Sequence, residues 1–183
     1  MISHDENDRP VDELNISPDE SDQLTKIHLD LPNHWWAKGE ALWVKELGEG
    51  LYEIRNIPFC AYGLNYGDVV FATADAPDLK PEIRSIVRHS GNKTLRLFIP
   101  DDDGGMEGQD AYLSKLVAMD TWFERATKQL ICLNVNPEAD FDAVCAYLDR
   151  LVGGRVLQYE TCEEQVSGSF DAAPEDDDDD DTL

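Results

Sequence analysis

Long hydrophobic runs are missing from this sequence of 183 residues. A membrane-spanning helix needs about 20 consecutive apolar residues, and the strongly apolar stretches here extend over only a few positions each. The first ten residues, MISHDENDRP, also lack the basic start and apolar segment of a secretory signal. We therefore expect no membrane-spanning segment. We expect the protein to be cytoplasmic.

Cysteines are few and widely spaced, at Cys60, Cys132, Cys145 and Cys162. No Cys-x-x-Cys pair occurs, and no histidine stands at zinc-ligand spacing from a cysteine. A disulfide framework is not expected in a cytosolic chain with enough apolar residues for a core. The pattern predicts no metal site and no cofactor, and it indicates that Cys132 and Cys145 are small buried hydrophobic residues.

Basic residues are scarce, because 15 Lys and Arg stand against 39 Asp and Glu, and the formal net charge is −24. Binding to phosphate groups requires clustered basic side chains, so we expect no direct nucleic-acid binding. The acidic surplus is concentrated at the ends of the sequence. Residues 1–23 hold eight acidic residues and one basic residue, and residues 163–183 hold ten acidic residues and no basic one.

These two acidic flanks have little apolar content, so we predict that residues 1–23 and 163–183 are disordered. The run of aspartates at 176–181 is open to three interpretations: a solubilising tail, a contact for a basic partner, or a mimic of nucleic-acid charge. Residues 24–162, with 21 acidic and 14 basic residues, are predicted to form a single α+β domain. Residues 24–99 are expected to be mostly β, and residues 100–162 to read αβαβ.

The first part of this domain shows short stretches in which apolar and polar residues alternate, as they do in half-buried strands. Gly48-Glu49-Gly50 is suited to a hairpin turn, and residues 89–92 are expected to turn a second hairpin. Short connections leave no room for helices, which favours a curved antiparallel sheet or a small, partly open barrel. The predicted strands are 24–31, 42–47, 51–55, 68–73, 83–88 and 94–99.

In the second part of the domain, the spacing of apolar residues changes from the alternation of strands to the period of a helix. Apolar residues recur at helical spacing over 109–128, and a strand is predicted at 130–135. Asn136-Pro137-Glu138 resembles a capped helix start, Gly153-Gly154 a helix end, and residues 155–159 a final strand. Together with the strand at 94–99, this order predicts a ferredoxin-like βαβαβ half that lacks one strand.

The most unusual segment is 51–71, LYEIRNIPFCAYGLNYGDVVF, in which a loop between two strands carries Phe59, Tyr62 and Tyr66. Trp35, Trp36 and Trp43 add to the aromatic content of the same region. These side chains either fill the core of the first sheet or form an exposed contact surface, because tryptophan and tyrosine dominate binding hot spots. Exposure of the three loop aromatics distinguishes the two interpretations.

The same segment carries a family resemblance. Leu51-Tyr52, Asn56-Ile57-Pro58-Phe59, Tyr62-Gly63 and Gly67-Asp68-Val69-Val70, followed by Arg88-His89-Ser90-Gly91 and Thr94-Leu95-Arg96, resemble a bacterial family known only as domain of unknown function 4265. The resemblance extends over roughly residues 26–161. It implies a compact α+β domain and no established chemistry, so no catalytic residue is carried over from it.

Candidate site residues cluster around this loop. Asp68 follows Gly67 and is interpreted first as a turn cap, with a ligand carboxylate as the alternative. A nucleophile built from Cys60, His89 and Ser90 lacks the strand-to-helix turn that would activate it, so we assign no catalytic residue. The candidate binding residues are Asn56, Phe59, Tyr62, Tyr66, Asp68, Ser90 and Arg96.

Two functional hypotheses follow. The first is a non-enzymatic acidic module that binds a basic protein partner, and its most concrete form, by analogy with acidic inhibitors, is an immunity-type protein. The second is an enzyme or small-ligand domain with a pocket near Cys60, Asp68, His89 and Ser90. The charge and the lack of a convincing catalytic set favour the first.

Overall fold

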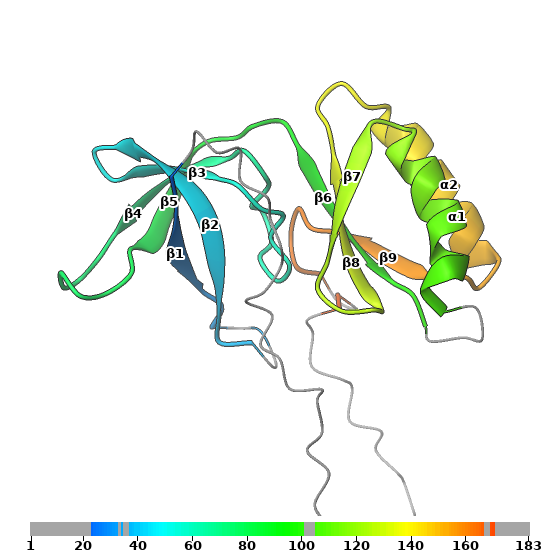
Figure 1. Ribbon diagram of the computed structural model, residues 1–183, viewed down its shortest axis with the longest axis horizontal. Helices are drawn as coiled ribbons and strands as arrows, with labels where there is room; N and C mark the ends of the chain where they lie inside the picture. Colours follow the sequence, from blue (N-terminus) through cyan, green and yellow to red (C-terminus); the bar gives the residue numbers. More distant parts are fainter. Residues whose placement is uncertain (1–22, 33, 35–36, 101–104, 167–168, 171–183) are drawn as a thin grey trace, which may run out of the picture.

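The computed structural model describes residues 23–32, 34, 37–100, 105–166 and 169–170. In this part of the chain nine strands form two sheets, and two helices cover one of them. Figure 1 shows the two sheets side by side, with both helices on the face of the second sheet that points away from the first. The structure is thus α+β, as the sequence predicts.

The first sheet is strongly curved, and its five strands follow chain order. Neighbouring strands are antiparallel, except that the first and last strands meet in parallel through the single pair His28 and Glu82. Because the ring is joined at that one pair, the sheet forms a small, partly open barrel. Its strands are β1 (Leu24–Asp30), β2 (Gly39–Gly48), β3 (Leu51–Ile54), β4 (Val69–Thr73) and β5 (Glu82–Arg88).

The barrel core follows from the alternation of apolar residues along these strands. Ile27, Leu42, Val44, Ile54 and Val70 are completely buried and pack together inside. The β2–β3 hairpin turns as predicted: Gly48, Glu49 and Gly50 all have positive φ angles, which glycine adopts without steric cost at two of the three positions.

The second sheet has the strand order β7-β8-β6-β9, and all of its strand pairs are antiparallel. In chain order it reads βαββαβ, which is the complete ferredoxin-like unit rather than the half that the sequence predicts. Its elements are β6 (Lys93–Phe98), α1 (Gly105–Val117), β7 (Thr121–Arg125), β8 (Leu130–Val135), α2 (Phe141–Gly153) and β9 (Gln158–Thr161).

The extra strand comes from residues that were predicted to be helical. The helix expected over 109–128 ends at Val117, and Asp120 then adopts a φ of 61° that no right-handed helix contains. Thr121, Trp122 and Phe123 follow, and β-branched and aromatic residues favour a strand. Residues 121–125 therefore pair with β8, although their apolar positions also fit a helical period.

The second predicted hairpin, around residues 89–92, is wrong. β5 pairs with β4 and belongs to the barrel, whereas β6 pairs with β8 and β9 in the second sheet. The turn at Ser90-Gly91-Asn92, where Gly91 has a φ of 90°, therefore connects the two sheets instead of closing one of them.

Helix α2 also begins later than predicted. Asp140 caps it, because its side chain accepts a hydrogen bond from the Ala143 amide at 3.0 Å. Asn136 closes a separate turn that precedes the cap, in which its carbonyl accepts from the Ala139 amide. Gly154 ends the helix, as predicted.

The two faces of the second sheet differ in chemistry. Toward the helices it presents the apolar residues of the larger core, in which Leu95, Leu97 and Leu133 pack against Leu116 of α1 and Leu148 of α2. Because successive side chains of a strand alternate between the two faces, the intervening residues of β6 and β8 lie on the opposite face. Figure 1 shows the barrel on that side of the sheet.

The sequence predicts disorder for residues 1–23 and 163–183, and of these, residues 1–22, 167–168 and 171–183 lie outside the described part of the chain. Two described residues of the second range contact the second sheet. Lys93 pairs with Glu163 at 2.6 Å, and the Phe170 ring packs edge-on against Phe98 at 6.5 Å between centroids.

We predict that Leu97→Ala lowers the free energy of unfolding by about 2–5 kcal/mol, because it leaves a cavity in the core beneath the helices. Leu79→Ala is the matched control, since Leu79 is 56% exposed and its loss should cost less than about 0.5 kcal/mol. Chemical denaturation followed by fluorescence measures both. Equal effects of the two substitutions would contradict the assigned core.

Candidate functional site

The loop between β3 and β4, residues 55–68, lies between the two sheets and contacts both (Figure 1). We refer to it as the interlayer loop. Its Ile57 amide donates to Glu124 of β7, its Tyr62 hydroxyl donates to Glu160 of β9, and its Asn65 accepts from Thr94 of β6. Three strands of the second sheet are thus tied to one loop of the barrel.

The face that the second sheet turns toward this loop carries a row of polar side chains, one from each strand. The strand registers place Cys132 opposite both Glu124 and Arg96, and Arg96 opposite Glu160. We call these four residues the polar row. Burying unpaired polar groups costs several kcal/mol, so we expect most of these groups to have partners; Arg96 Nη2 and Glu124 Oε2 are buried without one in the described residues.

Arg96 is the central cation of the polar row, with 3% of its side chain exposed. Its Nε lies 3.0 Å from Glu160 Oε1 and 3.0 Å from Cys162 Sγ, and the Tyr62 ring covers the guanidinium at 4.1 Å. Burial works against the charged form, but Cys162 and Glu160 outweigh it and hold the pKa of Arg96 above its ordinary value. The guanidinium therefore stays charged and fixed.

Glu40 reaches the interlayer loop from β2. Its two oxygens accept hydrogen bonds from the Phe59, Cys60 and Ala61 amides at 2.6, 3.0 and 3.0 Å. Three successive N–H groups that point at one carboxylate form a backbone anion-binding nest. Burial raises the pKa of Glu40, and the three amide hydrogen bonds and the charge of Arg96 oppose that rise.

Glu124 approaches the same loop from the second sheet. Its Oε1 accepts from the Ile57 amide at 3.4 Å, and its Oε2 is buried without a hydrogen-bond partner among the described residues. Burial raises the pKa of Glu124 to about 7, with the Ile57 hydrogen bond opposing and the charge of Glu40 adding to the rise.

The cysteines of this region are free thiols with no sign of activation. Burial raises the pKa of Cys162 to about 11 even though Arg96 opposes the rise, and burial raises the pKa of Cys132 well above its ordinary value. A nucleophilic cysteine needs a lowered pKa, so these thiols are protonated packing groups at neutral pH.

A second polar cluster lies where β5 leads into β6. Asp68 is fully buried and accepts from the Ser90 amide at 2.7 Å and the Asn65 amide at 3.0 Å, with His89 Nδ1 at 3.4 Å. The Ser90 hydroxyl donates to the Tyr66 carbonyl at 2.7 Å. The Ser90 hydroxyl therefore donates its hydrogen bond to the backbone. The cluster links the turn at residues 65–68 to the turn at residues 89–92.

Most of the predicted candidates thus fall in two places. Asp68, Ser90 and His89 form the turn cluster, whereas Cys60, Tyr62 and Arg96 lie with the polar row. Asn56 belongs to neither. Its side chain accepts a hydrogen bond from the Trp43 amide of β2 and donates one to the Ile57 carbonyl, so it links the start of the interlayer loop to β2. The four residues suggested for an enzymatic pocket do not converge on one cleft.

The loop aromatics are half-buried rather than exposed. Tyr62 lies over Arg96, and the Tyr66 ring meets Trp122 edge-on at 4.9 Å. Phe59 is anchored through its amide to Glu40. This placement favours the packing interpretation over an exposed contact surface; Trp35 and Trp36 lie outside the described residues.

Sequence reasoning missed Glu40, Glu124 and Glu160. Each is a single acid inside or next to a predicted helix or strand, and only the hydrogen bonds of the folded chain reveal that they converge on one loop. The one available signal was Arg96, a charged residue between Leu95 and Leu97, because a charge inside an apolar strand requires a buried partner.

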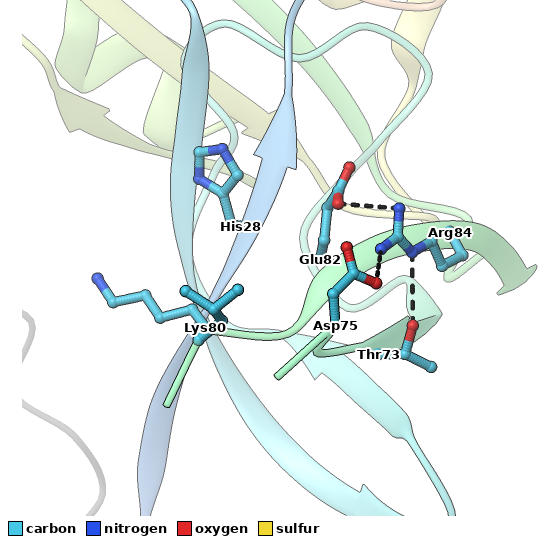
Figure 2. A pocket seen from close by; sticks show the side chains of 7 residues that line it. His28, Thr73, Asp75, Lys80, Glu82 and Arg84 are labelled. Carbon is cyan, nitrogen blue, oxygen red and sulfur yellow. Dashed lines mark hydrogen bonds and ion pairs between the residues drawn. The ribbon is translucent and has the colours of Figure 1, made fainter. Parts of the chain in front are cut away.

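A hollow of about 330 Å³ lies at the seam where β1 meets β5. Figure 2 shows Arg84 within it, bound to Asp75 and Thr73 and paired with Glu82. Its guanidinium is neutralised inside the chain, and no candidate residue from the sequence lines the hollow.

In the described ranges, no group of three or more His, Cys, Asp or Glu side chains is arranged to hold a metal ion. The same ranges contain no helix that is both long and apolar enough to cross a membrane.

We predict that Glu40→Gln lowers the free energy of unfolding by about 1–3 kcal/mol, because the amide nitrogen replaces an oxygen that accepts from the loop. Glu46→Gln on the same strand is the control, since Glu46 is exposed and should change stability by less than about 0.5 kcal/mol. Urea unfolding measures both, and an unaffected Glu40→Gln variant would show that the nest contributes little.

Comparison with solved structures gives one similar fold, the crystal structure of a hypothetical protein from Neisseria gonorrhoeae. The TM-score is 0.60 and the sequence identity 16%, and the match covers 76% of this chain and 94% of that chain. At this identity the likeness concerns the fold alone. Comparison with curated proteins finds no match.

Comparison with protein families matches residues 40–159 to the family described as Domain of unknown function (DUF4265). The match covers more than half of the sequence and agrees with the resemblance read from residues 51–96. This chain therefore belongs to the DUF4265 family.

Proposed function

We propose that this protein is a non-enzymatic acidic module that binds a basic protein partner, in the manner of an immunity-type inhibitor. The observation that carries the proposal is the charge: 39 acidic residues against 15 basic ones. Such a surplus accelerates association with positively charged partners and lowers the affinity for negatively charged ones.

The ion pairs of the domain support this proposal, because they neutralise five of its 14 basic side chains within the chain. Arg55 pairs with Glu53, Arg84 with Asp75 and Glu82, Lys93 with Glu163, Arg96 with Glu160, and Arg125 with Asp110. Several carboxylates are left exposed without an ion pair in the described part of the chain: Glu46, Glu49, Asp78, Glu138, Asp142 and Glu164.

The site geometry also argues for binding rather than catalysis. The Ser90 hydroxyl is committed to a carbonyl, and the pKa of Cys162 is raised rather than lowered. Neither group is paired with a general base, which a nucleophile requires. The interlayer loop and the polar row are therefore interpreted as the internal support of the module, and the acidic exterior as its contact surface.

We predict that the immobilised full-length chain retains a basic protein from native lysate at low ionic strength and releases it at about 1 M salt, where the Debye length is about 3 Å. Mass spectrometry identifies the retained protein. With the purified partner, the association rate constant should fall steeply as salt rises, while a small unrelated basic protein should bind weakly at every salt concentration.

Two variants of the C-terminal acidic segment test whether charge carries the binding. Replacing its acidic residues at 171–183 by Asn and Gln should slow association at least tenfold, within the range that electrostatic steering covers. A variant with the same residues in shuffled order should associate at the original rate. Retention of no basic protein at either salt concentration, or an association rate indifferent to salt, would refute the proposal.

A further inference from the structure

Two carboxylates from different sheets hold the same short stretch of the interlayer loop. Glu40 of β2 accepts from the amides of residues 59–61, and Glu124 of β7 accepts from the amide of Ile57. Glu40 belongs to the barrel that the loop leaves, so it holds the loop locally. Glu124 belongs to the second sheet, so its hydrogen bond is a contact between the two sheets.

The two carboxylates are supported unequally. Glu40 has three amide donors at 2.6–3.0 Å, whereas Glu124 has one at 3.4 Å and a second oxygen that is buried without a partner in the described residues. When two acids share a poorly solvated region, the acid with more hydrogen-bond donors takes the negative charge and the other retains the proton. In this pair Glu124 is the acid that retains the proton.

The charged and titratable groups around Glu124 do not offset a negative charge there. Glu40 faces it from β2 and repels it. Cys132 lies opposite it on β8, where burial raises the pKa of the thiol well above its ordinary value, and Cys60 lies in the adjoining loop. Arg96 stands one strand further away on β6, where Glu160 already pairs with it.

We propose that the contact between Ile57 and Glu124 is a proton-sensitive switch, in which protonated Glu124 holds the interlayer loop against the second sheet and ionised Glu124 turns outward and releases it. β7 is an edge strand of its sheet, with β8 as its one partner in the described structure, so no described strand covers its outer side. The released segment would begin at Ile57, and residues 59–61 would stay bound to Glu40.

The direction of the response follows from the carboxyl group. An acid whose pKa is higher in the folded protein than in the unfolded chain stabilises the folded contact at low pH, and that stabilisation is lost as pH rises through the higher value. The Ile57 hydrogen bond by itself favours ionised Glu124, but burial outweighs it and raises the pKa to about 7. The contact is therefore closed in weak acid and weakens above neutrality, where the ionised carboxylate gains more from solvent than from one amide.

Amide hydrogen exchange measured by NMR on the full-length chain tests the proposal at about pH 6 and about pH 8. In the unmodified protein, the protection factor of Ile57 should fall about tenfold over this range, following the loss of protonated Glu124. The protection factor of Ala61, which Glu40 holds, should stay constant. In Glu124→Gln the Ile57 value should be independent of pH, and in the exposed control Glu138→Gln it should follow the unmodified protein.

The proposal would be overturned by a protection factor of Ile57 that does not change with pH in the unmodified protein. The same fall of that protection factor in Glu124→Gln would also overturn it. Carbon-13 titration of the Glu124 carboxyl group in the unmodified chain provides a test that does not depend on any variant folding. A midpoint near neutrality supports the switch, and a midpoint near the ordinary glutamate value of about 4.3 refutes it. Neither experiment involves a binding partner, so both are independent of the proposed function.

Discussion

The burial of one guanidinium between two sheets is the interaction on which the rest of this structure depends. Arg96 is held by Glu160 and Cys162 and covered by Tyr62, with almost none of its side chain in contact with solvent. Removing either member of a buried ion pair leaves an uncompensated charge in a medium of low dielectric constant. The strand pairing that brings Glu160 beside Arg96 and the loop that brings Tyr62 over it are therefore energetically coupled.

From this coupling we expect the barrel and the ferredoxin-like unit to fold together. The second sheet buries its apolar face under α1 and α2, as ferredoxin-like sheets do, but its other face carries Glu124, Cys132 and Arg96. Without the interlayer loop these groups would face water, and without the second sheet the loop would lose the acceptors Glu124 and Glu160. Each unit thus supplies groups that the other requires, which a simple apolar interface would not do.

The sequence predicted the parts of the fold that depend on local pattern. Strands with regular alternation, the Gly48–Gly50 turn and the end of α2 at Gly153-Gly154 are encoded within a few residues. The predictions failed where pairing with a distant segment determines the local structure. Residues 121–125 fit a helical period, yet they form a strand that pairs with β8. The turn at residues 89–92 likewise has the local sequence of a hairpin. The prediction failed because the strands on either side pair with β4 and β8 and not with each other. The carboxylates around the loop were missed for the same reason, since no single strand reveals which residues lie beside it.

The single pair at which the barrel closes has a consequence for solubility during folding and storage. Beyond Glu82, β5 has β4 on one side and no described strand on the other, and its Ile86 and Val87 are 38% and 54% exposed. An open strand edge with apolar side chains is a template for pairing with another copy. Arg88 is exposed on this strand, and a charged side chain at a strand edge disfavours pairing with another copy. The strand thus carries its own protection against edge-to-edge aggregation, and this allows the barrel to remain partly open.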